Sequence, residues 1–140
     1  MGVLLDTNLL SELLRARPEP RVMAWFAGQP PASLFVSSVT QADMLLGAAL
    51  LPKGVRRQRL EAALQAIFSE DFEGRLLPFG PQEAPWFAEL VAARRRAGQP
   101  ISQFDAQIAA IARAHRLSLA TRNVRDFEAC GLHLINPWME

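Results

Sequence analysis

The sequence is poor in the residues that cross-link small proteins or anchor them in membranes. Among its 140 residues there is one cysteine, Cys130, which excludes an intrachain disulfide and a cysteine-based zinc site. No run of about 18 apolar residues is present, so we expect no membrane-spanning segment. The first residues also lack the basic stretch and cleavage site of a secretory signal. These absences favour a reducing, cytoplasmic setting.

Neither sign of charge predominates. The chain has 15 Lys and Arg residues against 14 Asp and Glu, a formal net charge of +1, so its overall charge does not indicate a nucleic-acid-binding protein. Lys53 is the only lysine. The remaining basic side chains are arginines, which favour bidentate contacts with phosphate and carboxylate groups.

Apolar runs and amphipathic segments alternate along the chain. The length fits a single domain spanning residues 1–140. We expect strands at 2–5, 34–36, 75–79, 117–120 and 132–135. We expect helices at 7–15, 22–28, 38–50, 56–69, 82–97 and 104–115. This alternation predicts an α/β fold whose mainly parallel sheet, of about five strands, is covered by helices on both faces.

Four aspartates stand beside apolar runs: Asp6, Asp43, Asp105 and Asp126. Ligands of open α/β sheets bind beyond the carboxyl ends of the strands, so these carboxylates can meet at one edge of the sheet. Asp105 also lies in an otherwise almost uncharged helix, where a buried charge is costly unless it is paired or metal-bound. Clustered carboxylates repel one another unless a cation neutralises them. The pattern therefore points to a Mg²⁺ or Mn²⁺ site.

Each aspartate taken alone also has a purely structural interpretation as a helix cap. Residues 102–105 and 40–43 both fit the capping-box pattern, with Ser or Thr three residues before an acid. Asp6 suits the N-cap of the helix that follows it. Asp126 suits a turn with Asn123. Only the four acids together favour a functional site.

Five segments in order carry a resemblance to a known family. They are LDTN at 5–8, SSVTQAD at 37–43, ISQFDAQIA at 101–109, LATRNVRDF at 119–127 and INPW at 135–138. With this spacing the chain resembles PIN-domain endoribonucleases, in particular the FitB-like branch of the VapC-type toxins of bacterial toxin–antitoxin pairs. The resemblance runs nearly end to end, and it implies a PIN-like three-layer αβα sandwich.

The resemblance also implies a set of metal-binding acids. Asp6 matches the first acid and Asp105 the third. The fourth position corresponds to Asp126 or Asn123, of which we favour Asp126. The second acid is normally Glu in this family, whereas this chain has Asp43, whose side chain is one methylene shorter. A water can bridge that gap, because Mg²⁺ usually retains several waters.

Polar neighbours of these acids have expected roles as well. Thr7, Asn8 and Thr121 are expected to hydrogen-bond the metal-binding carboxylates. Arg122 and Arg125 flank the expected site and are candidates for contacts with RNA phosphates. The run of arginines at 94–96 ends a predicted helix, where cations complement the helix dipole, and we expect it to be a solvated face.

The function implied by the resemblance is metal-dependent hydrolysis of RNA phosphodiester bonds. It further implies a cognate antitoxin of the VapB or FitA kind, which inserts a C-terminal segment into the acidic groove, and a homodimer that pairs again in the complex with the antitoxin. Apolar residues beyond the needs of a small core suggest a partner surface: Leu9, Leu10, Leu13, Leu14, Val22, Trp25 and Phe26.

Two alternatives compete with this function. A phosphatase of the haloacid-dehalogenase type needs a second Asp where this chain has Asn8, together with a downstream lysine, and Lys53 lies in a Pro-Gly turn. The stronger alternative is a catalytically degenerate PIN domain that binds RNA or an antitoxin without cutting, because Asp43 departs from the family pattern.

Overall fold

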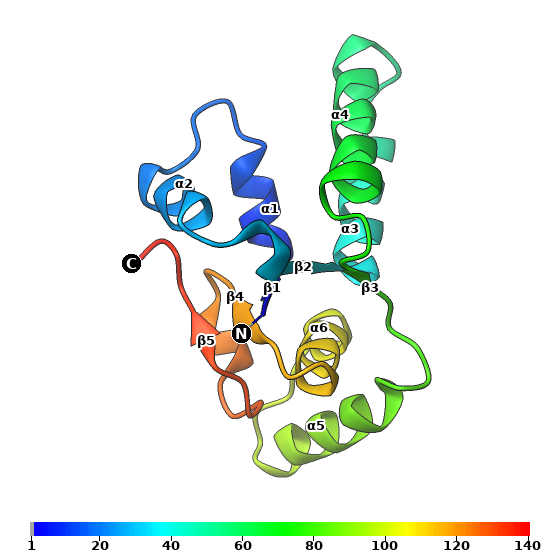
Figure 1. The fold of residues 1–140 in the computed structure, drawn as a ribbon. Coiled ribbons are helices and arrows are strands. Elements are labelled where there is room, and N and C mark those ends of the chain that lie inside the picture. The colour runs from blue at the N-terminus through cyan, green and yellow to red at the C-terminus, as the bar shows by residue number, and fades with distance from the viewer. Residues whose placement is uncertain (1) are drawn as a thin grey trace.

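A parallel sheet of five strands forms the centre of the computed structural model, which describes residues 2–140 (Figure 1). The strands are β1 (Val3–Leu5), β2 (Leu34–Ser37), β3 (Leu76–Leu77), β4 (Ser118–Ala120) and β5 (Leu134–Ile135). They lie in the order β3-β2-β1-β4-β5, and every neighbouring pair is parallel. The predicted fold class and strand number are confirmed, although β3 is shorter than the predicted strand at 75–79.

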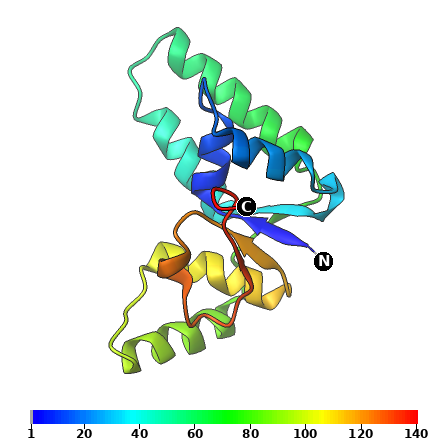
Figure 2. The ribbon, with the colours of Figure 1, turned by 90° about the vertical axis from the view of Figure 1, so that its left-hand side faces the viewer.

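Helices cover both faces of the sheet. They are α1 (Thr7–Leu13), α2 (Pro20–Ala27), α3 (Ser38–Ala49), α4 (Val55–Ala66), α5 (Ala84–Arg96) and α6 (Gln103–Ala114). Figures 1 and 2 show α1 to α4 on one side of the sheet and α5 and α6 on the other. The three-layer αβα arrangement implied by the family resemblance is therefore present.

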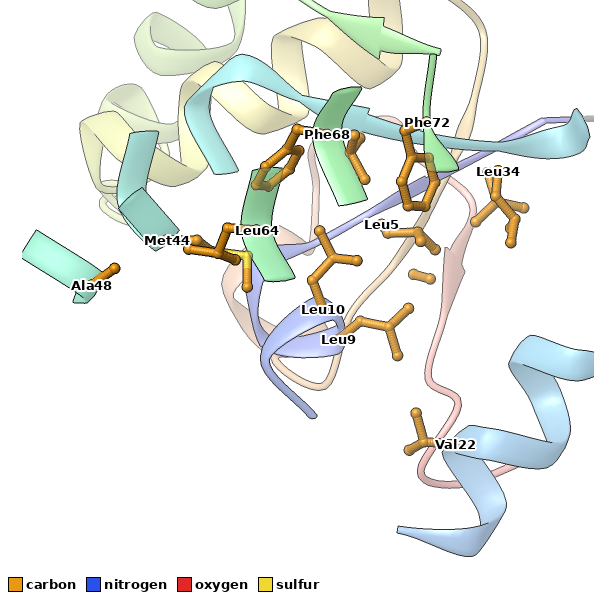
Figure 3. Packing of buried hydrophobic residues seen from close by; sticks show 13 residues of the cluster. Leu5, Leu9, Leu10, Val22, Leu34, Met44, Ala48, Leu64, Phe68 and Phe72 are labelled. Atoms are coloured by element: carbon orange, nitrogen blue, oxygen red, sulfur yellow. The ribbon is translucent and has the colours of Figure 1, made fainter. Parts of the chain in front are cut away.

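Two apolar clusters hold the layers together, one on each face of the sheet, and successive residues of β1 pack alternately into one and the other. Val3 and Leu5 point into the cluster beneath α1 to α4, part of which is shown in Figure 3. Leu4, between them, packs on the opposite face against α6. The residues of α6 on that face include Ala106 and Ala109, both fully buried, whose small side chains allow the helix to lie close to the sheet.

Two local features differ from expectation. α3 begins directly after Ser37, whose hydroxyl accepts a hydrogen bond from the Thr40 N–H (3.0 Å). The predicted capping box at 40–43 is therefore wrong, because Thr40 lies inside the helix and is fully buried. The predicted helix at 56–69 is also not uniform, since α4 passes into a π-helical turn at Ile67–Asp71.

The order of the strands brings two distant segments together at the middle of the sheet. β1 and β4 are neighbours, with Leu5 paired with Ala120. The Asp6 N–H continues this pairing by donating to the Ala120 carbonyl (2.9 Å). Asp6 and Thr121 therefore lie side by side, because each directly follows one of two adjacent strands.

No helix among residues 2–140 is long and apolar enough to cross a bilayer.

Candidate metal and catalytic pocket

Asp6 is a nearly buried carboxylate that is held in a single orientation. Its Oδ1 accepts from the Thr7 N–H (2.8 Å), which makes it the N-cap of α1 as predicted. Its Oδ2 accepts from the Thr121 hydroxyl (2.7 Å) and from the Asn8 side-chain amide (3.2 Å). Only 4% of the residue is exposed. Burying a charged group so deeply is costly without such partners.

The Thr121 hydroxyl is the hub of this hydrogen-bond network. It donates to Asp6 and accepts from the Asn8 amide (3.3 Å) and from the Asn123 N–H (3.0 Å). The Asn8 side-chain oxygen in turn accepts from the Arg122 N–H (3.3 Å). α1 and the loop after β4 are thus joined around the carboxylate.

A second contact ties the start of α1 to α3. The Thr7 and Thr40 hydroxyls lie 3.0 Å apart, within hydrogen-bonding distance. The first turn of α3 is therefore fixed beside the segment that carries Asp6. The buried hydroxyl of Thr40 therefore contacts Thr7 and does not cap a helix as the sequence predicted.

Asp105 and Asp126 bring further negative charge to Asp6. The pKa of Asp6 is raised above its ordinary value mainly by burial; hydrogen bonds from Thr121 and Thr7 oppose the rise, and the charges of Asp105 and Asp126 add to it. The pKa of Asp105 is likewise raised, first by burial and then by Asp126. The charges of Asp105 and Asp126 therefore oppose ionisation of Asp6, and the charge of Asp126 opposes that of Asp105, which is the kind of arrangement that a divalent cation relieves.

A pocket of about 420 Å³ opens beside Asp6. Its lining residues are Asp6, Thr7, Asn8, Ser11, Glu12, Arg15, Phe104, Asp105 and Asn123. Asp105 enters it from the first turn of α6, where its N–H donates to the Ser102 hydroxyl (3.1 Å) as the capping pattern predicted. The acids from both ends of the chain therefore face one pocket.

The donors of this pocket suit Mg²⁺ or Mn²⁺. Carboxylate, amide and hydroxyl oxygens are the ligands that these ions prefer. Within residues 2–140 no three His, Cys, Asp or Glu side chains converge closely enough to form a complete metal cage. Mg²⁺ does not require one, because it is usually bound by one or two carboxylates together with waters. Asp6 and Asp105, which both line the pocket, are the two carboxylates that would supply such a site, and this role stays a prediction.

Asp43 lies apart from these acids. It is exposed on α3, one turn beyond Thr40, and it is not among the residues that line the pocket. Its role as a metal-binding acid stays a prediction. Asp126 is exposed in the short 3₁₀ helix Val124–Phe127, and Asn123 precedes that helix and lines the pocket.

Glu12 is a pocket residue for which the sequence suggested no role. It is 5% exposed, and one of its oxygens accepts from the Glu19 N–H (2.9 Å). Both oxygens accept from Arg15 (3.0 Å each). The pKa of Glu12 is lowered by the Glu19 N–H first, then by Arg15 and the charge of Arg122. The one signal in the sequence is that Glu12 follows LDTN by four residues, on the helix predicted to begin there.

The two arginines expected to contact phosphate are both exposed beside Asp126. The Arg122 guanidinium lies 5.3 Å from the centre of the Trp138 ring, in a cation–π contact. This contact joins the final segment of the chain to the rim of the site. A role in binding phosphate stays a prediction for Arg122 and Arg125.

The PIN-domain family model matches residues 3–131. The chain belongs to the PIN-domain family. It is 39% identical to VapC ribonuclease Y4jK of Sinorhizobium fredii, and the match covers 97% of each protein. It is 37% identical to Toxin FitB of Neisseria gonorrhoeae, where the match covers 97% of this chain and 98% of that protein. Among solved structures it is similar to FitAB bound to an IR36 DNA fragment, with a TM-score of 0.92, 36% identity and coverage of 97% of this chain and 95% of that one. The resemblance to FitB-like PIN domains is thereby confirmed.

One arginine of this PIN domain contradicts the expectation of a solvated helix end at 94–96. Arg94 is 7% exposed, whereas Arg95 and Arg96 are exposed. Arg94 falls on the same helical stripe as buried Leu90, four residues earlier, so its side chain points into the protein. The four-residue spacing from Leu90 is the sequence signal for a buried Arg94, although the three arginines in a row look equivalent.

Proposed function

We propose that this PIN domain is a Mg²⁺- or Mn²⁺-dependent endoribonuclease toxin of a toxin–antitoxin pair, acting in the cytoplasm. The observation that carries the proposal is the pocket lined by Asp6 and Asp105, in which the buried Asp6 carboxylate is fixed by the Thr121 hydroxyl. Its ionisation is opposed by the charges of Asp105 and of Asp126, although Asp126 does not itself line the pocket. Relatives named as a VapC ribonuclease and as Toxin FitB support it.

The residues of the pocket have distinct roles in this reaction. Asp6 and Asp105 would hold the metal ion, and the fourth position would be taken by Asp126, whose charge acts on Asp6, or by Asn123, which lines the pocket. When bound, the ion lowers the pKa of a water and stabilises negative charge on the phosphate. Thr121 and Asn8 fix the orientation of the Asp6 carboxylate by their hydrogen bonds.

Basic side chains at the rim have the task of placing the RNA. Arg122 and Arg125 are exposed beside the acids, where an arginine can bind a phosphate oxygen in bidentate fashion. Such contacts position the scissile bond but do not read bases.

The direct test is cleavage of a total-RNA pool by the purified, antitoxin-free protein. Discrete fragments are expected with Mg²⁺ or Mn²⁺, and none with EDTA. A folded protein that binds RNA but yields no fragments in either metal would instead support the degenerate PIN domain, acting as an RNA- or antitoxin-binding module. The exposed position of Asp43, outside the pocket lining, is the observation that favours this second candidate.

Restoring the family residue at position 43 separates these candidates further. Asp43→Glu lengthens the side chain by one methylene, on a helix that is anchored to the pocket through Thr40 and Thr7. We expect the Mg²⁺ concentration for half-maximal cleavage to fall by about tenfold, the lower end of effects seen when groups around a metal change. Asp71→Glu, an exposed carboxylate outside the pocket, is the matched control. Equal metal dependence of the wild type and the Asp43→Glu variant would remove position 43 from the site.

An apolar groove of about 440 Å³ is the surface that we assign to the antitoxin. It is lined by Leu10, Leu13, Leu14, Met23, Phe26, Pro31, Leu34, Ile67, Asp71, Phe72 and Arg75. The set of residues expected from the sequence was too broad here, because Leu9 and Val22 are core residues that do not line the groove. The relative in the FitAB structure is a complex, which supports a partner of this kind.

A second apolar surface, on α3 and at the start of α4, suits a homodimer. Leu45, Leu46, Leu50 and Val55 are between 43% and 76% exposed. Burying such a patch against a second copy removes it from water. We expect the double variant Leu46→Glu, Leu50→Glu to be monomeric in sedimentation equilibrium. A wild-type protein that is already monomeric would contradict this assignment.

A further inference from the structure

The side chain of Arg94 reaches from α5 to two other segments. Its Nε donates to the Gln99 carbonyl (2.6 Å). One terminal nitrogen donates to the carbonyls of Asp126 (3.1 Å) and Glu128 (2.8 Å) and approaches the Cys130 sulfur (3.4 Å). A single guanidinium therefore binds backbone oxygens of two segments, the turn at Gln99 and the segment 126–128.

One of these segments leads to Asp105, which lines the pocket, and the other contains Asp126, whose charge acts on Asp6. Gln99 lies in the turn between α5 and α6, three residues before Ser102, which caps the helix that presents Asp105. The Gln99 N–H donates back to the Arg94 carbonyl (2.9 Å), so the two residues are held to each other twice. On the other side, Asp126 is itself one of the bonded residues.

The charge of Arg94 is surrounded by neutral hydrogen-bond partners. Its partners are neutral carbonyls and a thiol, and no carboxylate in residues 2–140 forms a salt bridge with it. A buried cation without a contacting anion is costly. Part of the compensation comes from the hydrogen bonds that the guanidinium donates to three backbone carbonyls.

We propose that Arg94 is a positioning residue of the metal pocket, which holds the Asp105 and Asp126 segments at a fixed separation without touching metal or RNA. This inference rests on the proposed function. The planar fork matters, because it serves carbonyls on two segments at once, which a point-like ammonium group does less well.

The test compares Arg94→Met, Arg94→Lys and the wild type, with Arg96→Met as a matched control on the exposed face of the same helix. Two quantities are measured: the metal concentration that gives half of the rise in Tm caused by Mn²⁺, and the kinetic constants of RNA cleavage. We expect Arg94→Met to need about 10- to 100-fold more metal, as for loss of other groups that orient ligands. The KM for RNA should not change, Arg94→Lys should be intermediate, and Arg96→Met should match wild type.

A purely structural role would give a different result. Arg94→Met would then lower the metal-free Tm and leave the metal dependence unchanged, which would overturn the proposal. If Arg94→Met does not fold, the same metal titration is made with Arg94→Lys. An unchanged metal dependence of Arg94→Lys would then overturn the proposal that the guanidinium of Arg94 positions the two segments. A wild-type protein whose Tm and cleavage do not respond to metal would overturn the proposed function as well.

Discussion

Replacing Asp105 by Asn is expected to abolish RNA cleavage and at the same time to stabilise the metal-free protein. The variant loses a carboxylate of the metal pocket, so the cleavage rate should fall by at least about 100-fold. It also loses a negative charge that is half-buried and opposed by Asp126, so we expect Tm in EDTA to rise by about 3 °C. RNA cleavage and thermal unfolding of the same preparation check both expectations.

The gain in stability has a defined pH dependence. The pKa of Asp105 is raised in the folded protein above its ordinary 3.8, by burial first and then by Asp126. A group of this kind favours the folded state most below its ordinary pKa, and this advantage is lost as the pH rises through the raised value. The Tm difference between variant and wild type should therefore be larger at neutral than at acidic pH.

Asp71→Asn is the matched control for both measurements. Asp71 is exposed and does not line the metal pocket, so cleavage and metal-free Tm should stay as in wild type. Full cleavage by Asp105→Asn would remove Asp105 from the metal site. A lower Tm of that variant in EDTA would show that the charge of Asp105 is not opposed in the folded protein.

The positions of Asp6 and Asp105 could be predicted because they follow strongly local signals. Asp6 ends an apolar strand, and Ser102 with Asp105 forms a capping pattern that the structure reproduces. In both cases the residue that caps the helix also faces the pocket, since the end of a strand, the start of a helix and the mouth of the site coincide. The capping interpretation of both residues is confirmed, and their role as metal-binding acids stays a prediction.

Features that depend on the rotation of a helix could not be predicted in the same way. A run of three arginines looks uniform, yet only Arg94 turns inward, because the phase of α5 is set by Leu90 packing below it. Thr40 looked like a cap and is an interior residue of α3, because Ser37 takes the cap position one turn earlier. A shift of a few residues at a helix start changes which side chain reaches the site.

A charge placed in the apolar groove is expected to release the toxin from its antitoxin without impairing the nuclease. Met23 is 41% exposed in the free protein, so Met23→Glu leaves the fold intact. In the complex the new carboxylate would be buried without a partner, because the guanidinium of nearby Arg75 already donates to the carbonyls of Pro31, Leu34 and Asp71. An unpaired buried charge costs about 3 kcal/mol, so Kd should rise by roughly 100-fold.

The geometry of α1 explains why the nuclease should be unaffected by Met23→Glu. One face of this helix lines the groove with Leu10 and Leu13, and the other lines the metal pocket with Thr7, Asn8 and Ser11; the two cavities share no lining residue. Co-expressed antitoxin should therefore no longer rescue growth, while purified Met23→Glu cuts RNA like wild type. Met139→Glu, which is 74% exposed and outside the groove, is the control. Undiminished antitoxin binding by Met23→Glu would place the antitoxin on a different surface, since no tight complex buries an unpaired carboxylate at its apolar centre without loss of affinity.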